Sequence, residues 1–419
     1  MTVAQSKAVG SSPHSSTLPI LVAGGGIGGL ACALVLSRQG FRVKVMEQAS
    51  EVGEIGAGIQ LGPNAFAAFD ALGVGERARA RAVYTDRMLM MDAVDAQLVA
   101  DVPLGGEFRR RFGNPYAVIH RADVHKSLLE GVQETERIEF VTSTRVTGLE
   151  QDHAGVTVFD ARGGAHRGCA LIGCDGVRSA VRQQIINDDV RVTGHVVYRA
   201  VVEAADFPAD LRWNFPTIWV GPDCHLVHYP LRGGEQFNLV VTFHSSRPET
   251  WGVTDGDREE VLAHFQGIHA QPRQLLDLPK NWRRWATADR EPVANWSVGR
   301  VTLLGDAAHP MMQYLAQGAC MALEDAVTLG AATAEIATQG GDLASAFARY
   351  ERARVTRTAR MVLSTREMGR IYHARGIERL VRNDLWKGRT AARYYDALEW
   401  IYGWRAEACL PQEAQPAPV

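Results

Sequence analysis

The chain has 419 residues, of which 46% are hydrophobic and 22% are charged, and its formal net charge is −2. This length accommodates roughly two or three globular domains, and a near-neutral charge with Lys and Arg spread along the chain argues against a nucleic-acid-binding protein. The six cysteines form no Cys-x-x-Cys pair and no Cys/His cluster at metal-ligand spacing, which predicts reduced thiols, no metal site and a cytoplasmic protein.

The two ends of the chain differ from the rest in composition. Residues 1–17 lack the basic and apolar segments of a signal peptide, so we expect a flexible N-terminus. Residues 410–419 are predicted to be a disordered tail. No apolar run reaches the ~20 residues that a bilayer span requires. We therefore expect a soluble protein with small-molecule partners.

Residues 18–48 show the pattern of a βαβ unit, in which a Gly-rich turn and a helix connect two apolar strands. Gly24, Gly26 and Gly29 fit the G-x-G-x-x-G pattern, whose glycines allow a tight turn, close approach of a pyrophosphate and close helix–strand packing. Glu47, at the end of the second strand, is placed where a carboxylate accepts hydrogen bonds from an adenosine ribose. The motif favours dinucleotide binding over an ordinary Gly-rich turn and leaves NAD and FAD open.

A further apolar strand begins at Ala170 and ends in Cys174-Asp175-Gly176. An acidic residue at a strand end either holds a loop through hydrogen bonds or contacts a ligand. The residues alone favour the loop-holding role for Asp175.

Residues 217–243 predict a β-hairpin that turns at Arg232-Gly233-Gly234, within a mostly antiparallel sheet. The alternation of side chains along a strand places His225 and Tyr229 on one face and His228 on the other. The pattern does not indicate which face meets a ligand. His225 is therefore either a functional residue or a hydrogen-bonded sheet histidine.

Residues 300–304 are a buried-strand pattern, followed by the stretch GDAAHPMMQYLAQGAC. Asp306 at this strand end suits a polyol chain, because a carboxylate accepts the hydrogen bonds that hydroxyls donate. Gly318 and Ala319 lie at the start of a predicted helix, whose free N–H groups favour negative charge such as that of a reduced flavin. A nicotinamide cofactor has no use for this second, remote site, so the stretch favours FAD.

The C-terminal part is predicted to be helical, with one long helix from Leu343 to about Arg375. An aromatic segment follows, which we expect to serve packing or an oligomer contact and not a cofactor site. Its aromatic residues are Tyr394, Tyr395, Trp400, Tyr402 and Trp404.

Three motifs occur together and in order: the Gly24 motif, CDGVRS from Cys174 and GDAAHP from Gly305. In this combination the chain resembles the single-component (group A) flavoprotein aromatic hydroxylases. The resemblance implies FAD bound without a covalent link, with Glu47 on the adenosine ribose and Asp306 on the ribityl chain. The complete set of cofactor residues that it implies is Gly24, Gly26, Gly29, Glu47, Arg121, Asp175, Asp306, Pro310, Gly318 and Ala319.

Within that set, Asp175 is associated with both FAD and the reduced nicotinamide, and Pro310 with the shape of the cavity near the reacting oxygen. The neighbouring His309 belongs to the motif whatever the substrate, so we expect a structural role beside the flavin.

The fold that the resemblance implies is an α/β Rossmann-like FAD-binding domain interleaved with a β-sheet substrate domain, plus C-terminal helices. The FAD-binding domain is expected at residues 18–85, 110–185 and 285–340, the substrate domain at 86–109 and 186–284, and the helical region at 341–409.

The segment PMMQYLAQGAC departs from the P-x-x-G-Q-G pattern of many members and resembles that of the 3-hydroxybenzoate 6-hydroxylases, which make gentisate. The likeness implies His225 and Gln313 as catalytic residues and Tyr116, Tyr229 and Gln313 as substrate-binding residues. For both tyrosines the alternative is a core residue with a solvated hydroxyl. The likeness also implies NADH and O2 as co-substrates and a homodimer.

In the implied reaction, NADH reduces FAD, oxygen adds at flavin C4a, and the ring carbon para to the phenol attacks the terminal oxygen of the hydroperoxide. A neutral histidine with a pKa near 6.5 can accept the phenol proton, which assigns His225 as the general base. No anchor is assigned to the substrate carboxylate, since Arg232 lies at a hairpin turn. The alternatives are a salicylate hydroxylase that forms catechol, another hydroxybenzoate or hydroxynaphthoate hydroxylase, and a flavin-binding regulator or inactive scaffold.

Overall fold

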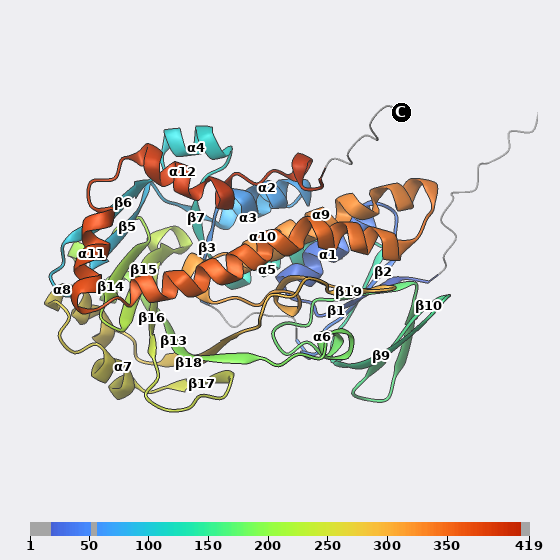
Figure 1. Cartoon of the computed structure of the whole chain (residues 1–419), viewed down its shortest axis with the longest axis horizontal. Coiled ribbons are helices and arrows are strands. Elements are labelled where there is room, and N and C mark those ends of the chain that lie inside the picture. Colours follow the sequence, from blue (N-terminus) through green and yellow to red (C-terminus); the bar gives the residue numbers. More distant parts are fainter. Residues whose placement is uncertain (1–17, 52–56, 412–419) are drawn as a thin grey trace, which may run out of the picture.

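The protein is described by a computed structural model that covers residues 18–51 and 57–411 (Figure 1). The predicted flexible N-terminus, residues 1–17, and residues 412–419 of the predicted tail lie outside the described residues. The described chain forms two large sheets, with helices packed against them and a C-terminal group of helices. This arrangement confirms the predicted α/β class with C-terminal helices.

The first large sheet contains the dinucleotide-binding pattern. Its six strands follow the order β19-β20-β12-β1-β2-β8, and all neighbours are parallel except β19 and β20. The strands are β1 (Ile20–Ala23), β2 (Val43–Met46), β8 (Ile138–Val141), β12 (Ala170–Gly173), β19 (Ser297–Val298) and β20 (Val301–Leu303). Since parallel neighbours end at the same edge, the segments that follow β1, β12 and β20 lie side by side.

The second large sheet has eight strands in the order β17-β18-β13-β16-β15-β14-β5-β6 and is antiparallel except between β14 and β5. The strands are β5 (Arg87–Asp92), β6 (Leu98–Pro103), β13 (Arg191–Glu203), β14 (Thr217–Gly221), β15 (Cys224–Leu231), β16 (Gln236–His244), β17 (Gly252–Gly256) and β18 (Trp282–Asp289). The predicted hairpin corresponds to β15 and β16, which η3 (Arg232–Gly234) connects. The expected domain boundary between residues 284 and 285 falls inside β18, which pairs with β13 on both sides of it.

Two three-stranded sheets complete the β structure. One consists of β9 (Val146–Asp152), β10 (Gly155–Asp160) and β11 (Ala165–Gly168), and the other of β3 (Gly58–Leu61), β4 (Val83–Tyr84) and β7 (Ala117–His120). The helices before the C-terminal group are α1 (Ile27–Arg38), α2 (Pro63–Ala71), α3 (Gly75–Arg81), α4 (Gly106–Phe112), α5 (Arg121–Gln133), α6 (Ala180–Ile185), α7 (Arg258–His264) and α8 (Ala270–Arg273). In the described ranges no helix is long and apolar enough to cross a membrane.

The C-terminal group connects the two large sheets. It comprises α9 (Gly318–Gln339), α10 (Leu343–Tyr372), α11 (Gly376–Trp386) and α12 (Ala391–Tyr402). The long α10 packs on α9 and beside β19, and it extends along the molecule to the eight-stranded sheet (Figure 1). There the loop residue Asp223 donates its backbone N–H to the carbonyl of His373, which directly follows α10, at 3.1 Å.

A buried ionic network joins α9 to α10. Arg354 on α10 donates to Glu324 at 2.7 Å and to Asp325 at 2.6 Å, and all three side chains are nearly inaccessible to solvent. Asp325 also accepts hydrogen bonds from His309 Nε2 at 2.5 Å and from the backbone N–H of Gly305 at 3.1 Å. The network therefore fixes both ends of the predicted GDAAHP motif against the two helices.

Candidate active site

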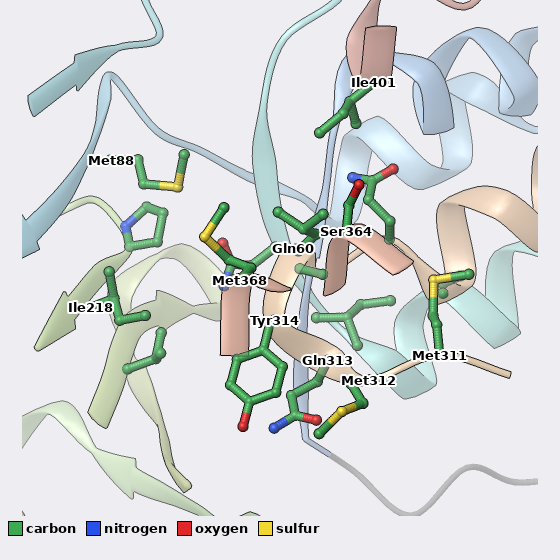
Figure 2. A pocket seen from close by; sticks show the side chains of 18 of the residues that line it. Gln60, Met88, Ile218, Met311, Met312, Gln313, Tyr314, Ser364, Met368 and Ile401 are labelled. Carbon is green, nitrogen blue, oxygen red and sulfur yellow. The ribbon is translucent and has the colours of Figure 1, made fainter. Parts of the chain in front are cut away.

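A cavity of about 730 Å³ lies where the carboxyl edge of the six-stranded sheet meets the eight-stranded sheet. Such a concave, mostly apolar space with a few polar groups is typical of ligand and cofactor sites. Figure 2 shows Met88 and Ile218 across the cavity from Met311, with Gln313 and Tyr314 along another side. The cavity receives side chains from segments far apart in the sequence, including α10 and α12.

The Gly-rich turn has the shape that a pyrophosphate requires. Gly24 has φ +102°, and a Cβ there would lie 2.3 Å from the carbonyl oxygen of Cys174. A Cβ at Gly29 would lie 2.0 Å from the carbonyl oxygen of Gly24, so both positions exclude a side chain. Gly26 lines the cavity and has open space beside it. Gly24 and Gly29 therefore shape the turn, and Gly26 leaves room for a ligand.

Glu47 holds the same turn from the neighbouring strand. Its carboxylate accepts the backbone N–H of Gly25 at 2.7 Å and that of Ala49 at 2.8 Å. Each carboxylate oxygen has further acceptor sites. The half-buried Glu47 can therefore both support the turn and accept hydrogen bonds from a ribose.

The segment after β20 presents the chemistry expected for a ribityl chain and a pyrimidine ring. Asp306 is exposed to the cavity, and Gly318 and Ala319 line it at the start of α9. Arg121, the first residue of α5, adds a cation to the lining. These residues, together with the open Gly26, fit FAD, because they combine a polyol acceptor, a helix N-terminus and space for a pyrophosphate.

Asp175 and Pro310 do not line the cavity, and neither do Gly24 and Gly29 of the Gly-rich turn or Glu47 beside it. Asp175 accepts a hydrogen bond from Ser179 at 2.5 Å and from the backbone N–H of Ala180 at 2.7 Å, so its carboxylate caps α6. These hydrogen bonds give Asp175 a loop-holding role, and its neighbours Cys174 and Gly176 line the cavity, while its contact with a cofactor stays a prediction. Pro310 is buried and does not reach the lining, to which the next residues contribute Met311 and Met312.

His309 faces the ionic network and not the cavity. Burial raises the pKa of Asp325, but the adjacent His309 and Arg354 outweigh that effect and lower it to about 2. The carboxylate is thus ionised and holds His309 in place. This geometry supports the structural role expected for His309.

The four predicted substrate residues all line the cavity: Tyr116, His225, Tyr229 and Gln313. His225 is 2% exposed and projects from β15, directly opposite Thr242 on β16. Gln313, in η6 (Gln313–Leu315), donates its amide N–H to the hydroxyl of Thr242 at 3.3 Å. The sheet thereby places Gln313 beside His225, with the amide oxygen of Gln313 still available to a ligand.

The electrostatics of His225 differ from the expectation of a pKa near 6.5. Burial and, to a smaller extent, the nearby His195 together lower the pKa of His225 to about 3. The cause is loss of hydration, which disfavours the charged imidazolium. His225 is therefore neutral at physiological pH and can accept a proton, but it retains one only weakly.

The two predicted tyrosines are held in different ways. Tyr116 is 3% exposed and donates its hydroxyl hydrogen to Gln60 at 2.6 Å. Tyr229 packs against Gly58, where a Cβ would lie 2.5 Å from the tyrosine ring. Burial raises the pKa of both hydroxyls, so each remains a neutral hydrogen-bonding group. Gly58 is thus needed for Tyr229 to occupy its place in the wall.

Several lining residues were not predicted. Arg199 on β13 faces the cavity and stacks over Trp285 at 5.6 Å, which offers a cation to an acidic ligand. Tyr394, Trp400 and Tyr402 also line the cavity, so the aromatic segment serves the site as well as packing. A charged residue inside the apolar run of β13 was the available signal for Arg199, whereas no local signal identifies the aromatic residues.

Comparisons with known proteins agree with this geometry. The family described as FAD binding domain matches residues 17–365. The chain is 68% identical to 3-hydroxybenzoate 6-hydroxylase of Polaromonas naphthalenivorans (strain CJ2) over 96% of this chain and 100% of that relative. It is 60% identical to 3-hydroxybenzoate 6-hydroxylase of Klebsiella oxytoca over 93% of this chain and 98% of that relative.

Solved structures show the same architecture. A salicylate hydroxylase substrate complex superposes with a TM-score of 0.80 and 26% identity, covering 96% of this chain and 100% of the other. Klebsiella pneumoniae HpxO complexed with FAD and uric acid superposes with a TM-score of 0.79 and 27% identity, covering 92% and 96%. The chain therefore belongs to the FAD binding domain family and is an FAD-dependent monooxygenase of the group that contains the 3-hydroxybenzoate 6-hydroxylases.

Proposed function

We propose that this enzyme uses NADH and O2 to hydroxylate 3-hydroxybenzoate at carbon 6, forming 2,5-dihydroxybenzoate (gentisate). The observation that carries this proposal is the 68% identity over the full length of a relative with that named activity. Carbon 6 lies para to the 3-hydroxyl group, so loss of the phenol proton makes it the nucleophile. NADH as the donor rests on the likeness to this group.

The chain's own residues support this chemistry. Bound FAD, reduced by NADH, would supply an electrophilic oxygen atom derived from O2. Gly26, Asp306 and the start of α9 would hold the cofactor, while His225 would accept the phenol proton. Gln313 would keep the phenol oxygen beside His225, and Tyr116 and Tyr229 would contact the ring or its carboxylate. Bringing these groups to fixed positions in one buried cavity favours attack by a single ring carbon.

The cavity also has cations for an aromatic acid. Arg121 and Arg199 both line it. Burial lowers the pKa of Arg199, because removal from water disfavours its positive charge. A substrate carboxylate would compensate that charge. All six cysteines are free, which agrees with the cytoplasmic location that we propose. The homodimer that we propose rests only on the likeness to this group.

The first test is turnover by the purified, FAD-loaded enzyme with 3-hydroxybenzoate or salicylate. NADH oxidation and oxygen uptake would be followed together, products would be separated by chromatography, and NADPH would be compared with NADH. We expect gentisate from 3-hydroxybenzoate in proportion to NADH consumed. Catechol from salicylate, with 3-hydroxybenzoate unreactive, would contradict the proposal and favour the alternative that the salicylate hydroxylase structure represents.

A further inference from the structure

A second cavity, of about 440 Å³, lies on the other side of the substrate-site wall. Met312 and Tyr314 line both cavities, so they form part of the partition between them. The second cavity is lined largely by polar and charged side chains, among them His195, His244 and His373. It therefore offers an aqueous space close to a substrate site that is mostly apolar.

One hydrogen bond crosses the partition. His225 Nδ1 lies 2.8 Å from His373 Nε2. His225 lines the substrate cavity, whereas His373 is half-buried, lines the second cavity and caps the C-terminus of α10. In the described structure neither His225 Nε2 nor His373 Nδ1 has a protein hydrogen-bond partner. The pair is thus a continuous two-imidazole connection between the cavities.

The hydrogen bond determines how the two rings share protons. A neutral His225 that accepts a proton at Nε2 must carry its own hydrogen on Nδ1. That hydrogen is donated to Nε2 of His373, which consequently carries its hydrogen on Nδ1. His373 therefore holds His225 in the one tautomer that can act as a base toward a phenol in the substrate cavity.

We propose that His373 is a positioning and proton-transfer residue, through which the phenol proton passes from His225 to the second cavity. This inference rests on the proposed function. The phenol O–H bond breaks as an N–H bond forms at His225 Nε2, and the Nδ1 proton of His225 moves to His373 Nε2. The Nδ1 proton of His373 then passes to water. Reverse transfer returns a proton to the product's phenol oxygen and restores both tautomers, so no redox equivalent is required.

The surroundings of His225 and His373 favour passage of a proton through the two rings and disfavour a ring that stays protonated. Burial lowers the pKa of His225 to about 3 and that of His373 well below its ordinary value, so neither ring keeps an added proton. The negative end of the helix dipole of α10, which His373 caps, stabilises the passing cation. His195 stacks on His373 with ring centroids 5.4 Å apart and hydrogen-bonds Tyr314.

Titratable groups surround the pair on both sides. The substrate cavity, which His225 faces, is lined by Tyr116, Tyr229, Arg121, Arg199, Asp306, Glu367 and Arg389, and further groups lie on the partition and around the second cavity. The rings are those of His195, His244, Tyr314 and Tyr372. The charged groups are Arg191, Asp223, Arg366, Arg370, Arg375 and Glu378. Each of these arginines is paired with a carboxylate: Asp289 for Arg191 and Arg366, Glu367 for Arg370 and Asp223 for Arg375. The charges around the pair therefore largely cancel, and the pair is free to pass a proton in either direction.

The test compares His373→Gln, His373→Ala and the control His244→Ala, all as FAD-loaded enzymes. Gln retains an acceptor for the His225 Nδ1–H but cannot pass a proton on, and Ala leaves room for added imidazole. We expect both His373 variants to retain FAD and 3-hydroxybenzoate binding while kcat for gentisate falls by about 10²-fold, the lower end of the contribution of general acid–base catalysis. Imidazole should restore turnover in His373→Ala, but not in His373→Gln, and should not affect His244→Ala.

The outcomes separate this inference from the proposed function. Near-normal kcat in His373→Gln shows that orienting His225 is sufficient and overturns the relay, as does a His373→Ala variant that binds substrate but ignores imidazole. If His373→Ala fails to fold, the His373→Gln result still decides. Wild-type enzyme that makes no gentisate overturns both proposals. Normal wild-type turnover together with the expected variant pattern supports both.

Discussion

His225 and His228 show that the surroundings of a side chain depend on the face of the strand from which it projects. They lie three residues apart on β15 and are both buried. His225 enters the cavity and is hydrogen-bonded, while neither ring nitrogen of His228 has a hydrogen-bond partner among the described residues. His228 packs instead beside Trp219 and Phe207. The same residue type thus has opposite surroundings, which the two-residue period of a strand predicts.

At this scale we predict that His225→Gln will lower kcat for gentisate about 10²- to 10⁴-fold, the usual contribution of a general base. FAD content should remain unchanged, because His225 does not touch the predicted cofactor residues. Steady-state turnover and the flavin spectrum measure the two effects. The matched control is His228→Leu, which should keep near-normal turnover at neutral pH. Normal turnover in His225→Gln would remove this residue from the base role.

Individual residues were predictable where a single local property defines them. Gly24 and Gly29 have backbone surroundings that exclude any side chain, and Asp306 follows β20 by three residues at the carboxyl edge of the six-stranded sheet. Asp175 has the same sequence signature as Asp306, yet its carboxylate caps α6. Whether a strand-end carboxylate turns to a ligand or to a helix depends on the loop that follows it. The path of that loop depends on tertiary contacts, so the sequence pattern alone does not determine where the carboxylate points.

At the element scale, the antiparallel pair α9 and α10 determines the shape of the GDAAHP segment. Glu324 and Asp325 on α9 are fully buried anions, and Arg354 supplies the cation that compensates both. Arg357 adds a second donor to Glu324 at 2.7 Å. Buried ions of this kind are costly when a partner is removed, because the remaining charge has no solvent to stabilise it.

We therefore predict that Arg354→Met will reduce the free energy of unfolding by about 3–5 kcal/mol. It should also weaken FAD retention, since Asp325 anchors His309 and Gly305 next to Asp306. Chemical denaturation and flavin content after gel filtration measure these losses. Arg370→Gln, which removes a solvent-exposed pair with Glu367 on the same helix, should leave the free energy of unfolding nearly unchanged. Equal losses in the two variants would contradict the structural role of the network.

The C-terminal helices also mark the limit of prediction for whole elements. The amphipathic pattern of residues 343–375 predicts a long helix, and α10 occupies Leu343–Tyr372. The pattern does not show that its C-terminal cap, His373, meets His225 across 148 residues of sequence. Nor does it show that Tyr402 packs against Tyr116 with ring centroids 6.0 Å apart. Helical periodicity identifies a buried face but not the surface that covers it.

On the scale of the whole molecule, burial keeps three histidines neutral where the eight-stranded sheet meets the C-terminal helices, and a fourth, His228, on the other face of that sheet. Burial lowers the pKa to about 4 in His195, to about 3 in His225 and His228, and well below the ordinary value in His373. In the unfolded chain each would titrate near pH 6.5. Between these values the unfolded chain binds more protons than the folded protein. The folded state is consequently favoured above about pH 6.5 and loses stability as the pH falls toward 4.

We predict that the unfolding free energy of the FAD-loaded enzyme is nearly constant above about pH 6.5 and then declines, with each buried histidine contributing about 1.4 kcal/mol per pH unit. Asp325, with its pKa lowered to about 2, contributes only below its ordinary value of 3.8, which is below the pH range of the test. Denaturation midpoints measured from pH 7.5 down to about 4.5 provide the test, since this range begins above the unfolded-state pKa of histidine and ends before Asp325 contributes. His228→Leu should make the decline shallower by about 1.4 kcal/mol per pH unit, because it removes one buried histidine. His228 is chosen because it lies outside the proton-transfer pair. Stability that is independent of pH across this window, or an unchanged slope in His228→Leu, would show that these histidines are hydrated in the folded protein.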